Sequence, residues 1–268
     1  MKDGRRTCSR WARDMELLAN ASPADQEKII CSMSVMDMMK IDADFESWAH
    51  ENQLPPSGEG WRTWMLRAGR GFGKTRAGAE WVFRLGDGKP GARIALIGAT
   101  MTEARLVMVE GISGLLTVAN RYGRSLTWEP SLGRLSWPNG SQAQLFSGEN
   151  PDGLRGPEHD FAWCDELAKW NQAQESWDNL QFGLRRGSRP RTLVTTTPRS
   201  MRLLETIEAM PTTVTTLGRT SDNINLDEKV IALLTASYGG TRLGRQELDG
   251  EILKDIEGAL WTREMIDG

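Results

Sequence analysis

Cysteine and histidine are scarce in this sequence, and their positions exclude two kinds of centre. The 268 residues include three cysteines (Cys8, Cys31 and Cys164) and two histidines (His50 and His159). They lie far apart, so their spacing gives neither a disulfide framework nor a zinc site. A chain of this length can bury a sizeable core without such staples. The cysteine usage fits an intracellular, reducing compartment best.

Long apolar runs are also lacking. No segment approaches the roughly 20 apolar residues that a membrane-spanning helix needs. The first 20 residues are basic, but they contain an acidic amphipathic stretch rather than a continuous apolar segment and a small-residue cleavage site. These absences predict a chain that is neither secreted nor embedded in a membrane.

An excess of positive charge is missing as well. The formal net charge is −3, from 33 Lys and Arg against 36 Asp and Glu, which argues against tight nucleic-acid binding by the chain alone. Residues 1–60 carry 7 basic and 11 acidic side chains, so the remainder is nearly neutral. Arginine supplies 25 of the basic side chains. Its planar guanidinium suits the recognition of phosphates and carboxylates.

Two patterns divide the chain. Residues 10–50 have the spacing of two or three helices, one of them capped by Ser22 with Pro23 in its first turn. Residues 53–60 contain two prolines and two glycines and predict a linker or exposed turn.

Beyond residue 60, short apolar runs alternate with helical segments. The expected strands are residues 61–68, 92–99, 160–166 and 191–198, and the expected helices are residues 75–86, 102–116 and 171–184. This alternation predicts an α/β fold, with a mostly parallel central sheet and helices on both faces. Residues 125–147 predict a small antiparallel excursion with a hairpin turn at residues 138–140.

The segment AGRGFGKT, residues 68–75, lies between an expected strand and an expected helix. Its glycines allow the backbone to turn N–H groups inward around a phosphate. Lys74 would then reach the β- and γ-phosphates, and Thr75 would offer a hydroxyl to Mg²⁺. Ala68 stands where the full signature has glycine. The segment predicts a nucleotide-binding loop of Gly69, Arg70, Gly71, Phe72, Gly73, Lys74 and Thr75.

An acidic pair follows the apolar strand at residues 161–164. Asp165 and Glu166 stand at its carboxyl end. In a nucleotide-hydrolysing sheet the first carboxylate holds Mg²⁺, and the second orients and deprotonates the attacking water. For an isolated pair, acids at a helix N-terminus are the alternative. No NKxD-type segment that would read guanine is present, which favours ATP over GTP.

Three consecutive threonines, Thr195, Thr196 and Thr197, end the expected strand at residues 191–198. Their hydroxyls could sense a γ-phosphate at the same edge of the sheet. The strand propensity of β-branched residues explains the threonines equally well.

Four segments in order resemble the large terminase subunit of tailed phages and bacterial gene transfer agents. They are residues 69–82 (GRGFGKTRAGAEWV), residues 137–170 (with GLRG and WCDELAKW), residues 180–199 (LQFGLRRGSRPRTLVTTTPR) and residues 240–253 (GTRLGRQELDGEIL). The resemblance covers nearly everything from Trp61 onward. It implies a three-layer, RecA-like P-loop ATPase domain of the additional-strand class at residues 61–253, with a helical lid or partner-contact region at residues 1–60.

The resemblance also implies roles for the motif residues. Lys74 and Thr75 match the Walker A pair, Asp165 the Walker B aspartate, and Glu166 the catalytic glutamate. Thr195, Thr196 and Thr197 match the coupling motif that links hydrolysis to movement.

Three arginines are candidates for neutralising phosphate charge. Arg70 matches the arginine within terminase P-loops. Arg155, in GLRG, is a candidate for phosphate sensing or a subunit contact. Arg105 could be an arginine finger that reaches a neighbour's nucleotide, but a solvated helix arginine is the better reading there.

As a whole, the resemblance implies a motor that uses ATP and Mg²⁺ to drive double-stranded DNA into a prohead, in the cytoplasm of a bacterial host or producer cell. Several subunits would form a ring on the portal protein, with a small terminase subunit as a further partner. We expect the lone chain to be a monomer that binds DNA weakly, because phosphate neutralisation needs many cations at once and the domain is nearly neutral. A ring would multiply this weak contact. Residues 254–268 resemble the start of a linker to a ribonuclease-H-like domain, so we expect no nuclease activity from this chain.

Two other functions stay open. A helicase-type motor would need a second RecA-like lobe, for which the chain has no room. A docking module with a nucleotide-dependent switch would show negligible turnover. Turnover measured against protein concentration, with portal and DNA added, separates the switch from the motor.

Overall fold

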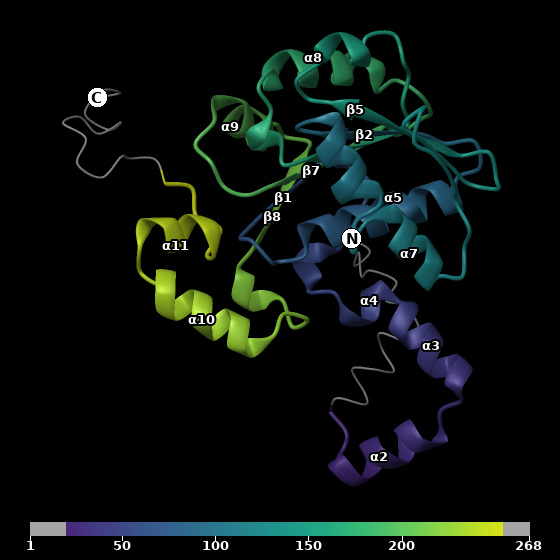
Figure 1. The fold of residues 1–268 in the computed structure, drawn as a ribbon, viewed down its shortest axis with the longest axis vertical. Helices are drawn as coiled ribbons and strands as arrows, with labels where there is room; N and C mark the ends of the chain where they lie inside the picture. Colours follow the sequence, from purple (N-terminus) through teal and green to yellow (C-terminus); the bar gives the residue numbers. More distant parts are fainter. Residues whose placement is uncertain (1–19, 254–268) are drawn as a thin grey trace.

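Eight strands pair into one sheet, around which the chain is built (Figure 1). The computed structural model describes residues 20–253. The strands are β1 (Thr63–Ala68), β2 (Arg93–Gly98), β3 (Thr127–Glu129), β4 (Arg134–Ser136), β5 (Gln142–Ser147), β6 (Phe161–Asp165), β7 (Arg191–Thr196) and β8 (Thr213–Gly218). Their order across the sheet is β3-β4-β5-β2-β6-β7-β1-β8.

The six strands from β5 to β8 in that order are parallel, and β4 and β3 extend the sheet in antiparallel pairing. The predicted mostly parallel sheet with a small antiparallel excursion is therefore confirmed. The hairpin turn joins β4 to β5, where the Trp137 N–H donates to Ser141 O at 2.9 Å. The sequence does not predict β8, because this edge strand is mostly half buried and lacks a continuous apolar run.

Helices cover both faces of the sheet, as predicted. The α-helices are α2 (Pro23–Ser32), α3 (Val35–Ala43), α4 (Phe45–Trp48), α5 (Lys74–Gly88), α6 (Met101–Glu103), α7 (Leu115–Arg121), α8 (Ala173–Gly183), α9 (Arg202–Glu208), α10 (Glu228–Tyr238) and α11 (Arg242–Glu247). Helices α5 and α7 pack on one face, and α8 and α9 pack on the other (Figure 1). Successive strand residues alternate between the two cores: Trp64 and Leu66 join the first, and Met65 the second.

Short helical turns connect these elements. The 3-10 turns are η1 (Glu51–Gln53), η3 (Pro151–Leu154), η4 (Leu167–Lys169) and η5 (Thr220–Asp222), and η2 (Ala104–Val109) is a π-helix. No helix within residues 20–253 is long and apolar enough to cross a membrane.

The prediction of one continuous helix at residues 102–116 is wrong. The chain forms α6, then the π-helix η2, and then turns before α7. The Glu110 N–H donates to Arg105 O at 3.0 Å, five residues back. A Cβ at Gly111 would lie 2.8 Å from Leu106 O, and one at Gly114 would lie 2.7 Å from Val109 O. These two glycines allow the backbone to turn where the apolar spacing alone suggests one helix.

The N-terminal helices leave the body of the molecule at α4 (Figure 1). Helix α2 begins as predicted, with Pro23 in its first turn and the Ser22 hydroxyl accepting from the Asp25 N–H, but it buries none of its residues. The division at residues 60 and 253 stays a prediction, and residues 254–268 lie outside the described part of the chain.

Gly78 sets the distance between α5 and the sheet. A Cβ at this position would lie 2.2 Å from Cε2 of Trp163, which is fully buried on β6. The Trp163 indole cannot move aside freely, because its Nε1 donates to Thr195 Oγ1 at 2.9 Å. Gly78 therefore allows the helix that starts at the glycine-rich loop to pack on the strand that ends at the acidic pair.

We expect Gly78→Ala to lower the free energy of unfolding by about 1 to 3 kcal/mol, because overpacking outweighs the better helix propensity of alanine. Urea denaturation measures this. Gly88→Ala is the matched control in the same helix, since nothing lies within 4 Å of its added Cβ, and it should be neutral or slightly stabilising. Equal stability of the two variants would contradict the packing role of Gly78.

Candidate active site

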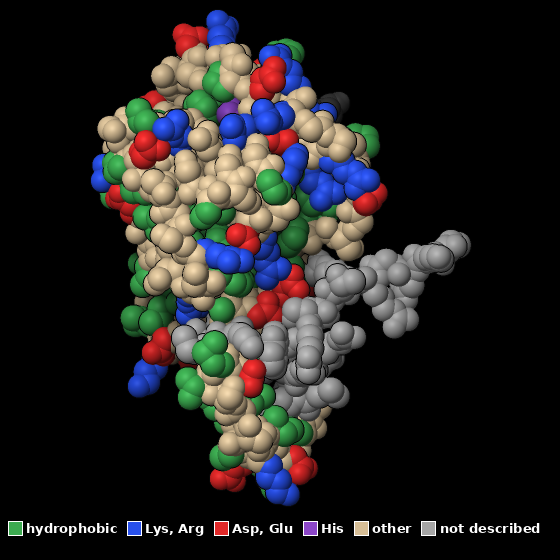
Figure 2. Space-filling view, turned by 90° about the vertical axis from the view of Figure 1, so that its right-hand side faces the viewer, with side chains coloured by type: hydrophobic (Ala, Val, Ile, Leu, Met, Phe, Trp, Pro, Cys, Tyr) green, Lys and Arg blue, Asp and Glu red, His purple; other side chains and the backbone are tan. Residues whose placement is uncertain are grey.

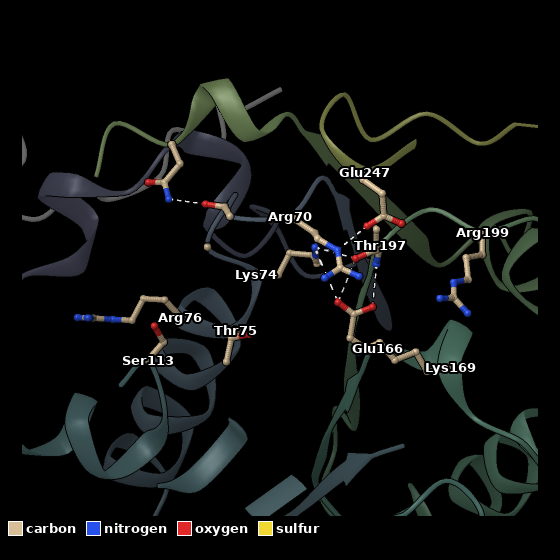
Figure 3. A pocket seen from close by; sticks show the side chains of 13 residues that line it. Arg70, Lys74, Thr75, Arg76, Ser113, Glu166, Lys169, Thr197, Arg199 and Glu247 are labelled. Carbon is tan, nitrogen blue, oxygen red and sulfur yellow. Dashed lines mark hydrogen bonds and ion pairs between the residues drawn. The ribbon is translucent and has the colours of Figure 1, made fainter. Parts of the chain in front are cut away.

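Three parallel strands bring the sequence motifs to one edge of the sheet. Strand β7 lies between β1 and β6 and pairs with both. The glycine-rich loop follows β1, the acidic pair ends β6, and the threonines end β7. Because the carboxyl ends of parallel strands meet at the same edge, all three motifs lie together there (Figure 3).

The loop after β1 has the backbone shape of a phosphate cradle. Gly71 and Gly73 have φ values of 77° and 95°, which favour glycine. Lys74 begins α5, so the N-terminal N–H groups of this helix follow the loop directly. Phe72 is fully buried and anchors the loop, and its carbonyl accepts a hydrogen bond from the Gln53 side chain.

Lys74 points back across the loop. Its Nζ donates to Ala68 O at 2.8 Å, to Gly69 O at 3.0 Å and to Thr197 Oγ1 at 3.2 Å. It also lies 3.9 Å from Glu166 Oε1. Burial lowers the pKa of Lys74, and the charges of Glu166 and Asp165 oppose this shift.

Glu166 is held in a strained conformation. Its φ of 47° is the only positive value of a non-glycine residue among residues 20–253. Such a backbone costs about 1 to 2 kcal/mol. The Thr197 N–H donates to Glu166 Oε2 and the Thr197 hydroxyl donates to Oε1, each at 3.1 Å. The strained backbone and these two bonds hold the carboxylate toward Lys74.

Asp165 lies deeper than Glu166, with 8% of its surface exposed. Burial raises its pKa to about 6, while the Thr195 hydroxyl, which donates to Oδ1 at 2.7 Å, opposes the shift. The Trp170 indole fixes the backbone here by donating to Asp165 O at 3.0 Å.

Arg70 is bound by the C-terminal part of the domain. Its Nε donates to Glu247 Oε2 at 2.5 Å, and its backbone N–H donates to Glu247 O at 2.6 Å. Glu247 raises the pKa of the Arg70 guanidinium by hydrogen bonding and by its charge. Thr220 and Asn223 bind the carbonyls of Arg70 and Gly71, each at 2.6 Å.

These residues line a cavity of about 460 Å³ (Figure 3). Seven predicted site residues line it: Arg70, Gly71, Gly73, Lys74, Thr75, Glu166 and Thr197. The other predicted residues of the three motifs do not line the cavity. Gly69 and Phe72 are part of the glycine-rich loop, and Asp165, Thr195 and Thr196 are buried.

Sequence reasoning misses several side chains of this cavity, namely Arg76, Ser113, Lys169, Arg199, Asn223 and Glu247. Arg76 and Arg199 directly extend recognised motifs and could have been found there. Asn223 and Glu247 come from segments without a local pattern, so nothing in the sequence points to them.

The two other candidate arginines lie outside this cavity. The Arg155 side chain is 71% exposed and forms an ion pair with Asp152 at 3.4 Å. The Arg105 side chain is 49% exposed and donates to Glu110 Oε1 at 2.8 Å.

A second cavity, of about 470 Å³, adjoins the first. The two share Gly73, Arg76, Ser113 and Asn223. The second cavity continues to two aromatic side chains of α4, Phe45 and Trp48, and to Gln53. It therefore offers an aromatic, partly polar space next to the phosphate cradle.

Comparison with known proteins identifies one family. The family described as terminase large subunit, T4likevirus-type, N-terminal, matches residues 65–267. A search of the curated proteins finds no match.

Three solved structures share the fold. The large terminase ATPase domain of Thermus phage P74-26 has a TM-score of 0.60 at 17% identity, over 79% of this chain and 98% of that one. The large terminase of a thermophilic bacteriophage in complex with ADP has a TM-score of 0.61 at 13% identity, over 71% and 48%. The large terminase of bacteriophage HK97 has a TM-score of 0.57 at 16% identity, over 82% and 51%. The chain thus matches about half the length of the latter two proteins.

Because Asp165 is buried, we expect that replacing its carboxylate with a neutral side chain raises the free energy of unfolding, and that this gain depends on pH. With a folded pKa of about 6, against about 3.9 when unfolded, the charged carboxylate lowers the free energy of unfolding by roughly 3 kcal/mol. This penalty is fully present above pH 6 and disappears as the pH falls below about 4. Asp165→Asn keeps a hydrogen-bond acceptor for Thr195 and should remove this penalty.

Urea denaturation with a metal chelator and no nucleotide, at about pH 8 and about pH 4, measures the effect. We expect Asp165→Asn to be more stable than the wild type at the higher pH and nearly equal at the lower. Asp152→Asn, at a side chain that is 83% exposed, is the control and should change neither value. A loss of stability for Asp165→Asn at the higher pH would contradict the burial argument.

Proposed function

The chain belongs to the T4-like family of terminase large subunits, as their N-terminal domain, and we propose that it hydrolyses ATP to translocate double-stranded DNA into a prohead. The observation that carries this proposal is the approach of Lys74 and Glu166, 3.9 Å apart, beside the N-terminus of α5. A cation for phosphate and a carboxylate for water then share one cavity.

The cradle is suited to the triphosphate of ATP. Residues 69–73 would surround the phosphates with backbone N–H groups, and Lys74 would exchange its contacts with Ala68 O and Gly69 O for phosphate oxygens. In the adjoining cavity, Phe45 and Trp48 offer apolar surface to the nucleoside. Solved structures of a related phage terminase contain ADP and ATP-γ-S.

A magnesium ion fits the donors at this site. No group of three or more His, Cys, Asp or Glu side chains within residues 20–253 could hold a metal alone. The ion would therefore be bound by phosphate oxygens, by the Thr75 hydroxyl and, through water, by the buried Asp165 carboxylate. Its chemistry there is to neutralise charge on the phosphates.

Glu166 is the proposed general base. Thr197 binds both of its carboxylate oxygens, so a water molecule between Glu166 and the γ-phosphate would meet an oriented acceptor. Lys74, on the other side of Thr197, would bind the γ-phosphate. We propose that Thr195, Thr196 and Thr197 couple hydrolysis to movement, because two of them contact the acidic pair directly.

Arg70 would change its partner when nucleotide binds. In the structure its guanidinium is neutralised by Glu247. A γ-phosphate is a stronger competing anion, so nucleotide binding would draw Arg70 from Glu247 and loosen α11 from the loop. This links the nucleotide site to the C-terminal helices.

Glu166→Gln should bind ATP as the wild type does and lose hydrolysis by about 100-fold or more, because the amide cannot accept a proton from water. Nucleotide binding by fluorescence titration and phosphate release at saturating ATP measure the two properties. Glu103→Gln, at an exposed residue outside the cavity, is the control. Unchanged turnover in Glu166→Gln would exclude the proposed base. Wild-type turnover that neither DNA nor portal stimulates would favour the nucleotide switch instead.

We further propose that the subunits act as a ring on the portal protein, with a small terminase subunit as a partner, and that Arg155 completes a neighbour's site. Arg155 is exposed, and among residues 20–253 its side chain pairs with the solvent-exposed Asp152. Such pairs contribute little, so the side chain is free to reach another subunit. For Arg105, the contact with Glu110 supports the role of a solvated helix arginine.

Mixing two inactive variants tests this assignment. Arg155→Ala subunits keep an intact cavity, and Glu166→Gln subunits keep the arginine, so a mixed ring contains complete sites. We expect each variant alone to be inactive with portal and DNA and the mixture to recover part of the wild-type turnover. Arg105→Ala alone should stay active. Arg155→Ala that stays active alone, or a mixture without recovery, would contradict a role in the neighbouring site.

A further inference from the structure

The amino ends of four adjacent strands, β2, β6, β7 and β1, carry a concentration of positive charge that the nucleotide site does not use. We call it the amino-edge surface. It comprises seven side chains at or before the starts of β1, β2 and β7: Arg62, Lys89, Arg93, Arg185, Arg186, Arg189 and Arg191. Three carboxylates, Glu59, Glu158 and Asp160, lie among them. A chain with a net charge of −3 therefore has a strongly positive face.

Asp160 fixes this surface from beneath. It is 2% exposed, and its carboxylate binds Lys89 Nζ at 2.5 Å, Arg186 Nε at 3.1 Å and the Arg93 N–H at 2.8 Å. Burial alone would raise the pKa of Asp160, but these three donors hold it below its usual value. The loop between α8 and β7 is thereby joined to the loop before β2.

The loop between α8 and β7 packs closely against Asp160. Gly187 has a φ of 74°, and a Cβ there would lie 2.8 Å from both Asp160 Oδ1 and Lys89 Nζ. Arg62 adds a further tie by donating to Leu184 O at 3.1 Å. The arginines of residues 185–191 thus extend from a defined loop rather than from a loose one.

The two outermost arginines are neutralised only weakly. Arg185 pairs with Glu158 at 2.9 Å, and Arg189 contacts both carboxylate oxygens of Glu59, at 2.5 and 2.7 Å. All four side chains are at least half exposed, so water and salt screen both ion pairs. A ligand with denser negative charge can replace them at small cost.

We propose that the amino-edge surface binds the phosphate backbone of a DNA duplex. The proposal rests on the proposed function, to which it adds the contact surface. Four adjacent strand ends span about 14 Å, which is wide enough to reach phosphates on both sides of a minor groove about 6 Å across. Arginine donors in this number suit backbone contacts, which carry no sequence preference.

The amino-edge surface and the nucleotide cavity lie at opposite ends of the strands. The cavity lies at the carboxyl ends of the strands and the amino-edge surface at their amino ends, about 20 Å away along a six-residue strand. Figure 2 shows Lys and Arg side chains over the upper half of one face of the molecule, with acidic side chains among them. DNA bound at the amino ends would leave the cavity open to ATP.

A phosphate backbone fits this surface better than a protein partner does. Protein interfaces have an apolar centre. Within residues 58–62, 89–93, 158–160 and 182–191, Phe182 is the only large hydrophobic side chain that is exposed, at 75%. It lies on the last turn of α8 and offers a test of the alternative.

The experiment is a fluorescence-anisotropy titration of a short DNA duplex with this chain over a series of salt concentrations. The double variant Arg185→Glu with Arg189→Glu should bind at least about tenfold more weakly at low salt, and its slope of log affinity against log salt should be smaller by about two. Lys28→Glu with Lys229→Glu, which makes the same change in charge on α2 and α10, should retain most of the affinity. Phe182→Ala should bind DNA as the wild type does.

Three results would overturn the proposal: no duplex binding by the wild type at low salt, an equal loss in the two charge-reversed variants, or a loss in Phe182→Ala as large as that in Arg185→Glu with Arg189→Glu. The last would point to an apolar docking face for a protein. ATP turnover without DNA is measured in parallel and should be unchanged in every variant. Because no side chain of the amino-edge surface lines the cavity, this turnover reports on the proposed hydrolysis separately from the DNA contact.

Discussion

Thr197 joins the two opposite charges of the site, and the remaining geometry depends on that contact. Its hydroxyl accepts from Lys74 and donates to Glu166, while its N–H binds the second oxygen of the same carboxylate. This requires β7 to lie between β1 and β6. The order of the strands, as much as the motifs, therefore makes the site. The tight packing of Gly78 against Trp163, whose indole binds Thr195, keeps α5 and the three strands in register.

The sequence predicts the features of this protein that depend on local patterns. Apolar strands, the glycine-rich loop and the acids at a strand end are each readable from a few neighbouring residues, and the structure brings them to one edge. The π-helix η2 is not predictable in this way, because the apolar spacing continues through it while Gly111 and Gly114 change the backbone. Glu247 is missed for another reason. Its role depends on α11 folding back to Arg70, 177 positions earlier in the sequence, and no local signal encodes that contact.

The glycine-rich loop is held by the segment after β8 as well as by the sheet. Glu247, Thr220 and Asn223 bind backbone or side-chain groups of Arg70 and Gly71. Thr220 and Asn223 accompany η5, and Glu247 ends α11, so the segment after β8 forms one wall of the cavity. The geometry of the proposed nucleotide site thus depends on the placement of this segment. The amino-edge surface has no such tie to the cavity, since Asp160 organises it at the opposite end of the strands.

The contacts on the edge of β8 bear on where an expressed fragment of this domain should begin. An unpaired strand edge is a template for aggregation. Here the Asn52 side chain donates to Leu217 O at 2.8 Å, and Gln53 beside it binds the carbonyl of Phe72. A fragment that begins at Trp61 would keep every motif but lose both contacts, and the loss of the Asn52 contact would expose the edge of β8 to other copies. The practical unit for expression therefore starts upstream of η1, even though the recognisable motifs begin later.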